Sequence, residues 1–184
     1  MEVILIAGHA QNGKDTFAGF LRDALTSDGH SVCIMHYADL LKFVCTQYLG
    51  WNGEKDESGR SLLQRIGTDV VRTQDPDFWV DFVTRLIGLL KDEWDYVLIP
   101  DCRFPNECDK PKELFPSVTV KIARKGFKSP LTAKQRRHPS ETALNDYEFD
   151  ETVRNDGDLC ALREKAIRWV VEHTGSHQTT FDEL

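Results

Sequence analysis

The hydrophobic residues of this chain fall into short continuous runs and longer stretches with helical spacing. Residues 2–7 form an apolar run that is typical of a strand buried on both faces. Residues 14–27 repeat apolar side chains every three or four positions, which predicts an amphipathic helix. The same alternation continues along the chain. It predicts strands at 31–37, 96–100, 117–123 and 149–154, and helices at 38–49, 60–73, 76–92, 106–115 and 158–173.

Strands that alternate with helices favour a mostly parallel sheet with helices packed on both faces. A chain of 184 residues has the length of one domain. We therefore expect an α/β fold of three layers in a single domain. Two stretches interrupt the alternation. They are a polar loop at 50–59 and a segment at 124–140, rich in Pro, Lys and Arg, which we expect to be a mobile flap.

A glycine-rich segment joins the first predicted strand to the first predicted helix. It runs Gly8-His-Ala-Gln-Asn-Gly13-Lys14-Asp15-Thr16. The pattern G-x-x-x-x-G-K between a strand and a helix is typical of a loop that holds nucleotide phosphates. Inward N–H groups, the helix N-terminus and Lys14 would supply the positive potential. The alternative is a plain connector without a ligand.

The residue after Lys14 departs from this motif, which has Ser or Thr there to hold Mg²⁺. Asp15 stands in its place, and a carboxylate is a good ligand for a hard cation. We expect Asp15 to contact the metal directly or through water, with Thr16 as a phosphate contact. The alternatives are an acid that only stabilises the first helical turn and a surface hydroxyl.

Other polar residues fall at the carboxyl ends of predicted strands, where parallel sheets bind ligands. Asp101 ends an apolar strand, which would place its carboxylate beside the metal. Arg103 follows and would bind an acceptor phosphate with two N–H groups. The alternative is a structural bridge between Arg103 and Asp101.

Several cations have ordinary explanations as well as functional ones. Arg65, Asp69 and Arg72 would share one helical face and, with Lys42, hold a monophosphate, or they form a solvated salt-bridged face. Trp79 would stack on a base or belong to the core.

The flap from residue 124 to 137 carries six Lys and Arg residues. It is either a cationic lid, with Arg136 and Arg137 as charge stabilisers, or a basic surface loop.

Composition narrows the partners to small molecules. The net charge of −7 argues against general nucleic-acid binding, so phosphate recognition would be local. The five cysteines are scattered without metal-ligand spacing, which favours reduced cysteines in a cytoplasmic protein. We expect no membrane association and no signal peptide, because no apolar run has the required length or position.

These segments together resemble the phage-type deoxynucleoside monophosphate kinases. The resemblance extends over about residues 3 to 170, and Asp101-Cys-Arg-Phe-Pro-Asn-Glu107 after a strand is its most specific element. The other segments are weaker alone. They are Gly13-Lys-Asp-Thr16, Ala38-Asp-Leu-Leu-Lys42, Leu63-Gln-Arg-Ile-Gly-Thr-Asp69, Phe78-Trp-Val80 and His138-Pro-Ser-Glu141.

The resemblance implies a P-loop kinase fold and transfer of the γ-phosphoryl group of ATP to a deoxynucleoside 5′-monophosphate, with Mg²⁺. It implies a location in the cytoplasm, that of the host for a phage enzyme, and allows a homodimer. It also divides the chain. The core would be 1–37, 94–123 and 149–174, the substrate-binding helical part 38–93, the basic lid about 124–146 and a flexible tail 175–184.

Individual roles follow from the resemblance. The ATP phosphates would be held by Gln11, Asn12, Gly13, Lys14, Asp15 and Thr16, and the adenine bordered by Asn155 and Gly157. The monophosphate site would use Lys42, Arg65, Asp69 and Arg103, and the lid or its hinge Arg137 and Glu141. We complete the substrate-binding set with Asp39, Arg72, Trp79, Glu107 and Arg136. The catalytic set is Lys14, Asp15, Asp101, Arg103 and Arg137, with Asp15 and Asp101 at the metal.

Two other functions remain open. The animal-type phosphomevalonate kinases are similar in the Gly-Lys-Asp start, the Asp-x-Arg strand end and a Ser-Glu segment before the last strand. The Phe-Pro-Asn-Glu and Phe-Trp-Val segments favour a nucleotide acceptor instead. The third interpretation is a nucleotide-binding regulatory module without phosphoryl transfer, against which Asp101 and the basic flap argue.

Overall fold

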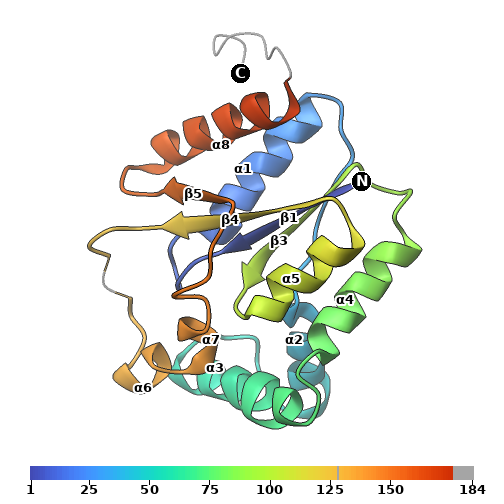
Figure 1. The fold of residues 1–184 in the computed structure, drawn as a ribbon. Coiled ribbons are helices and arrows are strands. Elements are labelled where there is room, and N and C mark those ends of the chain that lie inside the picture. Colours follow the sequence, from blue (N-terminus) through green and yellow to red (C-terminus); the bar gives the residue numbers. More distant parts are fainter. Residues whose placement is uncertain (128, 176–184) are drawn as a thin grey trace.

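A five-stranded sheet forms the centre of the molecule (Figure 1). The computed structural model describes residues 1–127 and 129–175. All four strand pairings are parallel, and the strand order is β2-β3-β1-β4-β5. The mostly parallel sheet predicted from the sequence is confirmed. The strands are β1 (Glu2–Ala7), β2 (Val32–Ile34), β3 (Tyr96–Cys102), β4 (Ser117–Ala123) and β5 (Glu151–Arg154).

Helices cover both faces of the sheet, which confirms the three predicted layers. Successive side chains of a strand point to opposite faces. Val3 and Leu5 of β1 accordingly pack in one core with α2 (Ala38–Tyr48), α4 (Phe78–Leu89) and α5 (Pro105–Leu114). Ile4 and Ile6 pack in the other core with α1 (Lys14–Ser27) and α8 (Leu159–Thr174). No helix within the described residues has the length and apolarity to cross a membrane.

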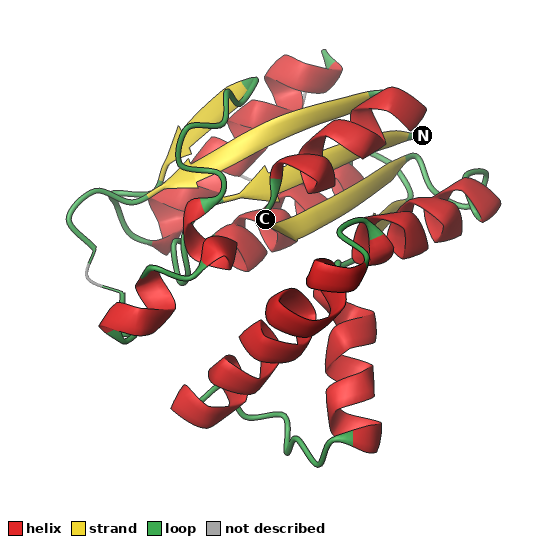
Figure 2. Cartoon of the chain, turned by 60° about the horizontal axis from the view of Figure 1, so that its bottom comes forward, coloured by secondary structure: helices red, strands yellow, loops and turns green. Residues whose placement is uncertain are grey.

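A group of helices projects beyond the sheet edge at which the strands end (Figure 2). It contains α2, α3 (Glu57–Gln64) and η1 (Arg65–Arg72), a π-helix. The sequence predicted one α-helix over 60–73. The helix instead begins at Glu57, because the carboxylate of Asp56 caps it by accepting the N–H of Gly59 at 2.7 Å.

The segment between β4 and β5 contains two short helices, α6 (Ala133–Arg136) and α7 (Pro139–Thr142), where we expected a mobile flap. Leu131 and Gln135 are buried in it, and the amide of Gln135 donates to the carbonyl oxygen of Glu57 at 3.3 Å. The described part of the flap is therefore packed against α3. Lys128 of the predicted lid, and residues 176–184 of the predicted tail, lie outside the described residues.

Candidate functional site

The glycine-rich loop between β1 and α1 has the backbone that its glycines permit. Gly8 and Gly13 have φ angles of 144° and 93°, which side chains rarely allow. A Cβ atom at Gly8 would lie 2.4 Å from the carbonyl oxygen of Ile122, and one at Gly13 would lie 2.5 Å from Nδ2 of Asn155. Both positions therefore require glycine.

Two asparagine side chains hold this loop against the sheet. Asn12 donates through Nδ2 to the carbonyl oxygen of Ile122 at 3.2 Å, and Asn155 donates to the carbonyl oxygen of Asn12 at 2.9 Å. Both side chains are buried. Asn155 is thus an anchor of the loop, and its contact with adenine stays a prediction, as does that of the exposed Gly157.

Lys14 lies at the start of α1 and is only 4% exposed. Its Nζ donates to the carbonyl oxygen of His9 at 3.1 Å, which bends the side chain back over the loop. Burial, followed by the nearby charge of Arg103, lowers the pKa of Lys14 to about 8. Glu141, Asp15 and Asp101 act in the opposite direction and help to keep it charged.

A cavity of about 230 Å³ opens beside Lys14, where the strands end. It lies between the loop, the projecting helices and the segment that contains α7. Cations from several elements line it: Lys14, Lys42, Lys55, Arg60, Arg72 and Arg103. The lining also includes Asp15, Asp101, Glu107, Glu141, His36, Tyr37, Leu63, Trp79, Phe104 and Leu131.

Asp101 caps the helix that follows β2. Its two carboxylate oxygens accept the backbone N–H groups of Tyr37 and Ala38, each at 3.0 Å. Arg103 does not bridge to Asp101, which was our structural alternative. It pairs with Glu141 of α7 instead, at 2.7 Å.

A histidine that our sequence reasoning missed lies at the mouth of the cavity. His36 Nε2 is 3.2 Å from Oδ1 of Asp15, and its Nδ1 is 3.3 Å from Oδ2 of Asp39. The hydrogen bond with His36 is the main cause that lowers the pKa of Asp15 to about 2. Asp39 in turn pairs with Lys42 at 2.9 Å. The position of His36 just after a strand was a usable signal.

Glu107 is 2% exposed and forms an ion pair with Arg72. Its Oε2 also accepts the backbone N–H of Arg103 at 2.5 Å and that of Phe104 at 3.0 Å. Burial raises the pKa of Glu107 to about 7, although Arg72 and these N–H groups oppose the change. Lys55 and Arg60, which we had not predicted, line the cavity from the helical part.

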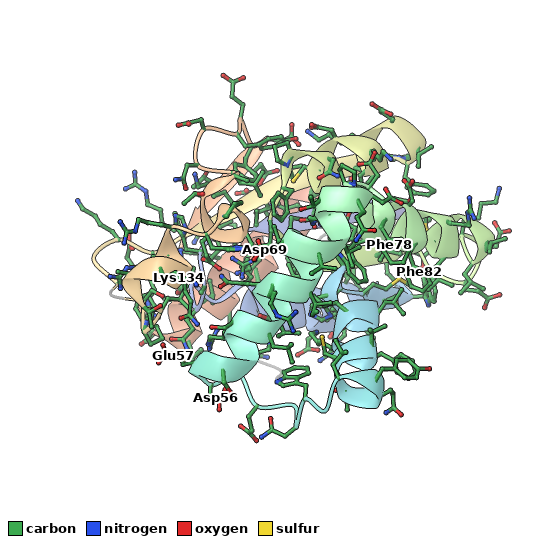
Figure 3. All side chains as sticks on the ribbon, turned by 90° about the horizontal axis from the view of Figure 1, so that it is seen from below. Asp56, Glu57, Asp69, Phe78, Phe82 and Lys134 are labelled. Atoms are coloured by element: carbon green, nitrogen blue, oxygen red, sulfur yellow. The ribbon has the colours of Figure 1, made fainter. Side chains whose placement is uncertain are left out.

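The structure separates Arg72 from the predicted common face of Arg65, Asp69 and Arg72. These residues lie in η1, and a π-helix turns less per residue than an α-helix, so positions seven apart no longer coincide. Arg72 lines the cavity, whereas Arg65 is exposed and outside the lining. Asp69 faces the segment that contains α6 and α7 (Figure 3), where it lies 3.3 Å from Nε2 of His138.

Trp79 belongs to the core, as one of its two interpretations predicted, and its stacking on a base stays a prediction. Its indole N–H donates to the carbonyl oxygen of Gly67 at 2.9 Å within the core, and the residue also lines the cavity.

The two arginines of the predicted lid, Arg136 and Arg137, do not line the cavity. Arg136 donates to the carbonyl oxygen of Leu131 at 2.7 Å, and Arg137 to that of Ala133 at 3.2 Å. Both are exposed and outside the lining, as are Gln11 and Thr16.

No three His, Cys, Asp or Glu side chains within residues 1–127 and 129–175 gather as a ready-made metal site. Asp15 and Asp101, however, line the same cavity as Lys14. Carboxylate oxygens are the ligands that Mg²⁺ prefers, and it usually takes only one or two of them together with phosphate oxygens. The donor set therefore fits a metal that arrives with a nucleotide.

Solved structures with a similar fold include the APS kinase CysC of Mycobacterium tuberculosis, described in complex with AMPPNP and APS. It superimposes with a TM-score of 0.51 at 14% identity, over 95% of this chain and 98% of that one. The Cys556Ala mutant of the same kinase gives a TM-score of 0.50 at 12% identity, over 95% and 97%. At these identities the likeness concerns the fold alone, which is that of a P-loop kinase.

Sequence comparison finds relatives in viruses. The Enterobacteria phage T4 deoxynucleotide monophosphate kinase is 32% identical over 116 residues, which are 62% of this chain and 46% of the relative. The uncharacterized protein ORF77 of Ictalurid herpesvirus 1 (strain Auburn) is 28% identical over 164 residues, 88% of this chain and 67% of the relative. The chain thus matches about half the length of the phage kinase.

A comparison with protein families matches residues 33–166 to the family described as "Deoxynucleotide monophosphate kinase". The matched range includes Asp101, Arg103 and Glu107 of the cavity and the segment with α6 and α7. It covers well over half of the chain. The protein therefore belongs to the deoxynucleotide monophosphate kinase family.

Proposed function

We propose that this protein transfers the γ-phosphoryl group of ATP to a deoxynucleoside 5′-monophosphate and releases ADP and the diphosphate. The observation that carries the proposal is the distribution of cations around one cavity. Lys14 lines it from the glycine-rich loop, Arg103 from the end of β3 and Arg72 from η1. Two phosphate-bearing molecules can therefore meet there. The family membership and the phage relatives support a nucleotide acceptor.

The donor side is the loop of residues 8–16. Its backbone N–H groups and Lys14 would hold the β- and γ-phosphates, and the N-terminus of α1 adds its dipole. Asp15 and Asp101 would hold Mg²⁺, which when bound neutralises charge that develops on the transferred group. Lys14 is preorganised for this role because the loop already holds its side chain in place.

The acceptor side is formed by Lys42, Arg72 and Arg103. A phosphate oxygen of the monophosphate attacks the γ-phosphorus in line, a new P–O bond forms, and the bond to the β-phosphate oxygen breaks. The attacking phosphate is already ionised at neutral pH, so no strong base is needed. The protein contributes positioning and positive charge.

The predicted roles of Arg136 and Arg137 require a movement of the segment that contains α6. In the described arrangement their side chains bind carbonyl oxygens of that same segment. A lid that rotates about α6 on substrate binding would release them toward the cavity. We keep Arg137 as a proposed charge stabiliser of that closed form.

A coupled assay of ADP release tests the function. The purified chain is supplied with ATP, Mg²⁺ and one of dGMP, dTMP, dCMP, dAMP or phosphomevalonate. We expect turnover with at least one nucleotide and little with phosphomevalonate. Turnover with phosphomevalonate alone would mean that the acceptor is phosphomevalonate and not a nucleotide. ATP binding without any turnover would indicate a regulatory module.

Two variants make the assay specific to this site. Lys14→Ala should lower kcat by about 10²-fold or more, because it removes a preorganised charge beside the transferred group. Lys91→Ala is the matched control, since this lysine is exposed after α4, outside the lining and outside the proposed lid. A normal rate for Lys14→Ala would mean that the loop is not the donor site.

A further inference from the structure

One buried carboxylate contacts both arginines on the acceptor side of the cavity. Oε1 of Glu107 forms the ion pair with the guanidinium of Arg72. Oε2 accepts the backbone N–H of Arg103 at 2.5 Å and of Phe104 at 3.0 Å. The side chain of Glu107 is 3% exposed, so both of its oxygens are engaged by the protein. It is placed to act on a ligand through these neighbours.

Arg72 is held on three sides. Besides Glu107, its guanidinium donates to the carbonyl oxygen of Pro76 at 3.0 Å and stacks on the ring of Phe104 at 4.1 Å from the centroid. A guanidinium has five N–H donors, and these two hydrogen bonds leave others for a ligand. Since Arg72 also lines the cavity, a phosphate there would meet a guanidinium whose orientation is already set.

Arg103 is held at its backbone. Glu107 lies in the first turn of α5 and reaches back to the N–H of the N-cap residue Phe104, as in a capping box, and the same oxygen accepts the N–H of Arg103. This contact sets where α5 begins and where the Arg103 side chain leaves the main chain. The hydroxyl of Tyr37, which is next to the helix end capped by Asp101, donates to the carbonyl oxygen of Glu107 at 2.7 Å. Glu107 is therefore bonded to Tyr37 before α2, to Arg72 of η1 and to the connection between β3 and α5.

A buried carboxylate is costly unless it is paired and hydrogen-bonded. Exposed caps and surface ion pairs stabilise helices without that cost, as Lys110 does on the same helix with Asp77 at 2.8 Å. Stability of α5 alone does not require a buried acid at Glu107. Its two-sided contact explains why it is there, because it places two cations at a fixed separation.

We propose that Glu107 is the positioning residue that sets Arg72 and Arg103 as a pair to bind the phosphate of the acceptor. This inference rests on the proposed function, whose acceptor is a monophosphate. Loss of the Glu107 carboxylate should then weaken binding of the acceptor and leave binding of ATP unaffected. Its ion pair and hydrogen bonds go to Arg72, Arg103 and Phe104, and none of these residues belongs to the loop of residues 8–16. A purely structural role would lower the thermal stability and leave both KM values unchanged.

The experiment compares KM for the preferred monophosphate, KM for ATP, kcat and Tm in four variants. Glu107→Gln keeps the shape and removes the charge. Glu107→Asp keeps the charge and withdraws it by one methylene. Arg72→Met and the double variant Arg72→Met with Glu107→Gln form a cycle, and the double variant contains no buried unpaired charge.

We expect Glu107→Gln and Glu107→Asp each to raise the acceptor KM by at least tenfold and to change the ATP KM by less than twofold. The double variant should raise the acceptor KM by much less than the product of the two single fold-increases, because part of the effect of Glu107 passes through the guanidinium of Arg72, which the second change removes. Lys110→Gln is the control, since it removes an exposed ion pair from the same helix, and it should leave both KM values unchanged.

Three results would overturn the proposal. The first is a lower Tm with an unchanged acceptor KM in either Glu107 variant. The second is multiplication of the single effects in the double variant. The third is a wild-type chain without turnover of any monophosphate, which would remove the proposed function as well. An active wild type with unaffected Glu107 variants would remove only the role of Glu107.

Discussion

The carboxylate of Glu141, in α7, accepts a hydrogen bond from the backbone N–H of Ala10 in the glycine-rich loop, at 3.1 Å. Its other oxygen pairs with Arg103 at 2.7 Å. A residue of the segment between β4 and β5 thus connects the proposed donor and acceptor sides. A carboxylate at a loop N–H also places negative charge where nucleotide phosphates would approach.

Glu141→Gln should therefore strengthen binding of ATP and weaken binding of the acceptor. Removing the charge relieves repulsion of the phosphates, so we expect the Kd for ATP to fall several-fold in calorimetric titrations. Arg103 loses its partner, and the acceptor KM should rise. Glu148→Gln, an exposed acid outside the lining, is the matched control. An unchanged Kd for ATP in Glu141→Gln would show that the carboxylate does not compete with phosphates.

The lowered pKa of Lys14 predicts how ATP binding depends on pH. Its pKa is about 8 in the free protein, and phosphates bind the charged form. As pH rises above 8 the free protein loses this proton, so the Kd for ATP should increase, approaching tenfold per pH unit. Lys14→Arg keeps its charge throughout and should abolish the rise. A flat Kd between about pH 7 and pH 9.5 in the wild type contradicts this assignment.

Asp15 is expected to determine the response to Mg²⁺. Its low pKa, caused first by His36, keeps the carboxylate ionised at any working pH. Asp15→Ser should raise the Mg²⁺ concentration for half-maximal activity several-fold, because a hydroxyl is a weaker ligand than a carboxylate. Asp23→Asn, on the exposed face of the same helix, should leave the response unchanged. If Asp15→Ser also leaves the Mg²⁺ response unchanged, Asp15 does not bind the metal and only stabilises the first turn of α1.

Gly8→Ala should destabilise the fold. The added Cβ would meet the backbone oxygen of Ile122 at 2.4 Å, and the φ angle of 144° is unfavourable for alanine. A loss of about 2 kcal/mol or more is expected, which lowers Tm by about 4–8 °C for a domain of this size. Gly19→Ala lies in α1 with open space around it and should instead raise Tm slightly. Equal melting temperatures for Gly8→Ala and wild type would contradict the described loop.

Elements defined by local pattern were predictable from the sequence. The predicted bounds 2–7, 14–27 and 117–123 coincide with β1, α1 and β4. Their apolar spacing and flanking glycines act within a few residues of one another, so no distant contact is needed. The loop of residues 8–16 and the position of Asp101 at a strand end followed in the same way.

The helix over 57–72 shows where local pattern is insufficient. The periodicity expected for an α-helix placed Arg65 with Arg72, but the chain winds as a π-helix from Arg65 onward. Gly67 of that helix packs against Leu41 of α2, and the N–H of Trp79 binds its carbonyl oxygen. Such contacts come from other elements, and the sequence of the helix does not contain them.

The α/β alternation, the glycine-rich loop between β1 and α1 and the family resemblance thus follow from the sequence alone. The partners of the charged residues follow from the packing of the fold: Arg103 pairs with Glu141 rather than Asp101, Arg72 pairs with Glu107, and Asp15 pairs with His36. These pairs join residues 21 to 38 positions apart. Spacing along the chain governs which face of one element a side chain occupies, whereas the packing of several elements decides which charge it meets.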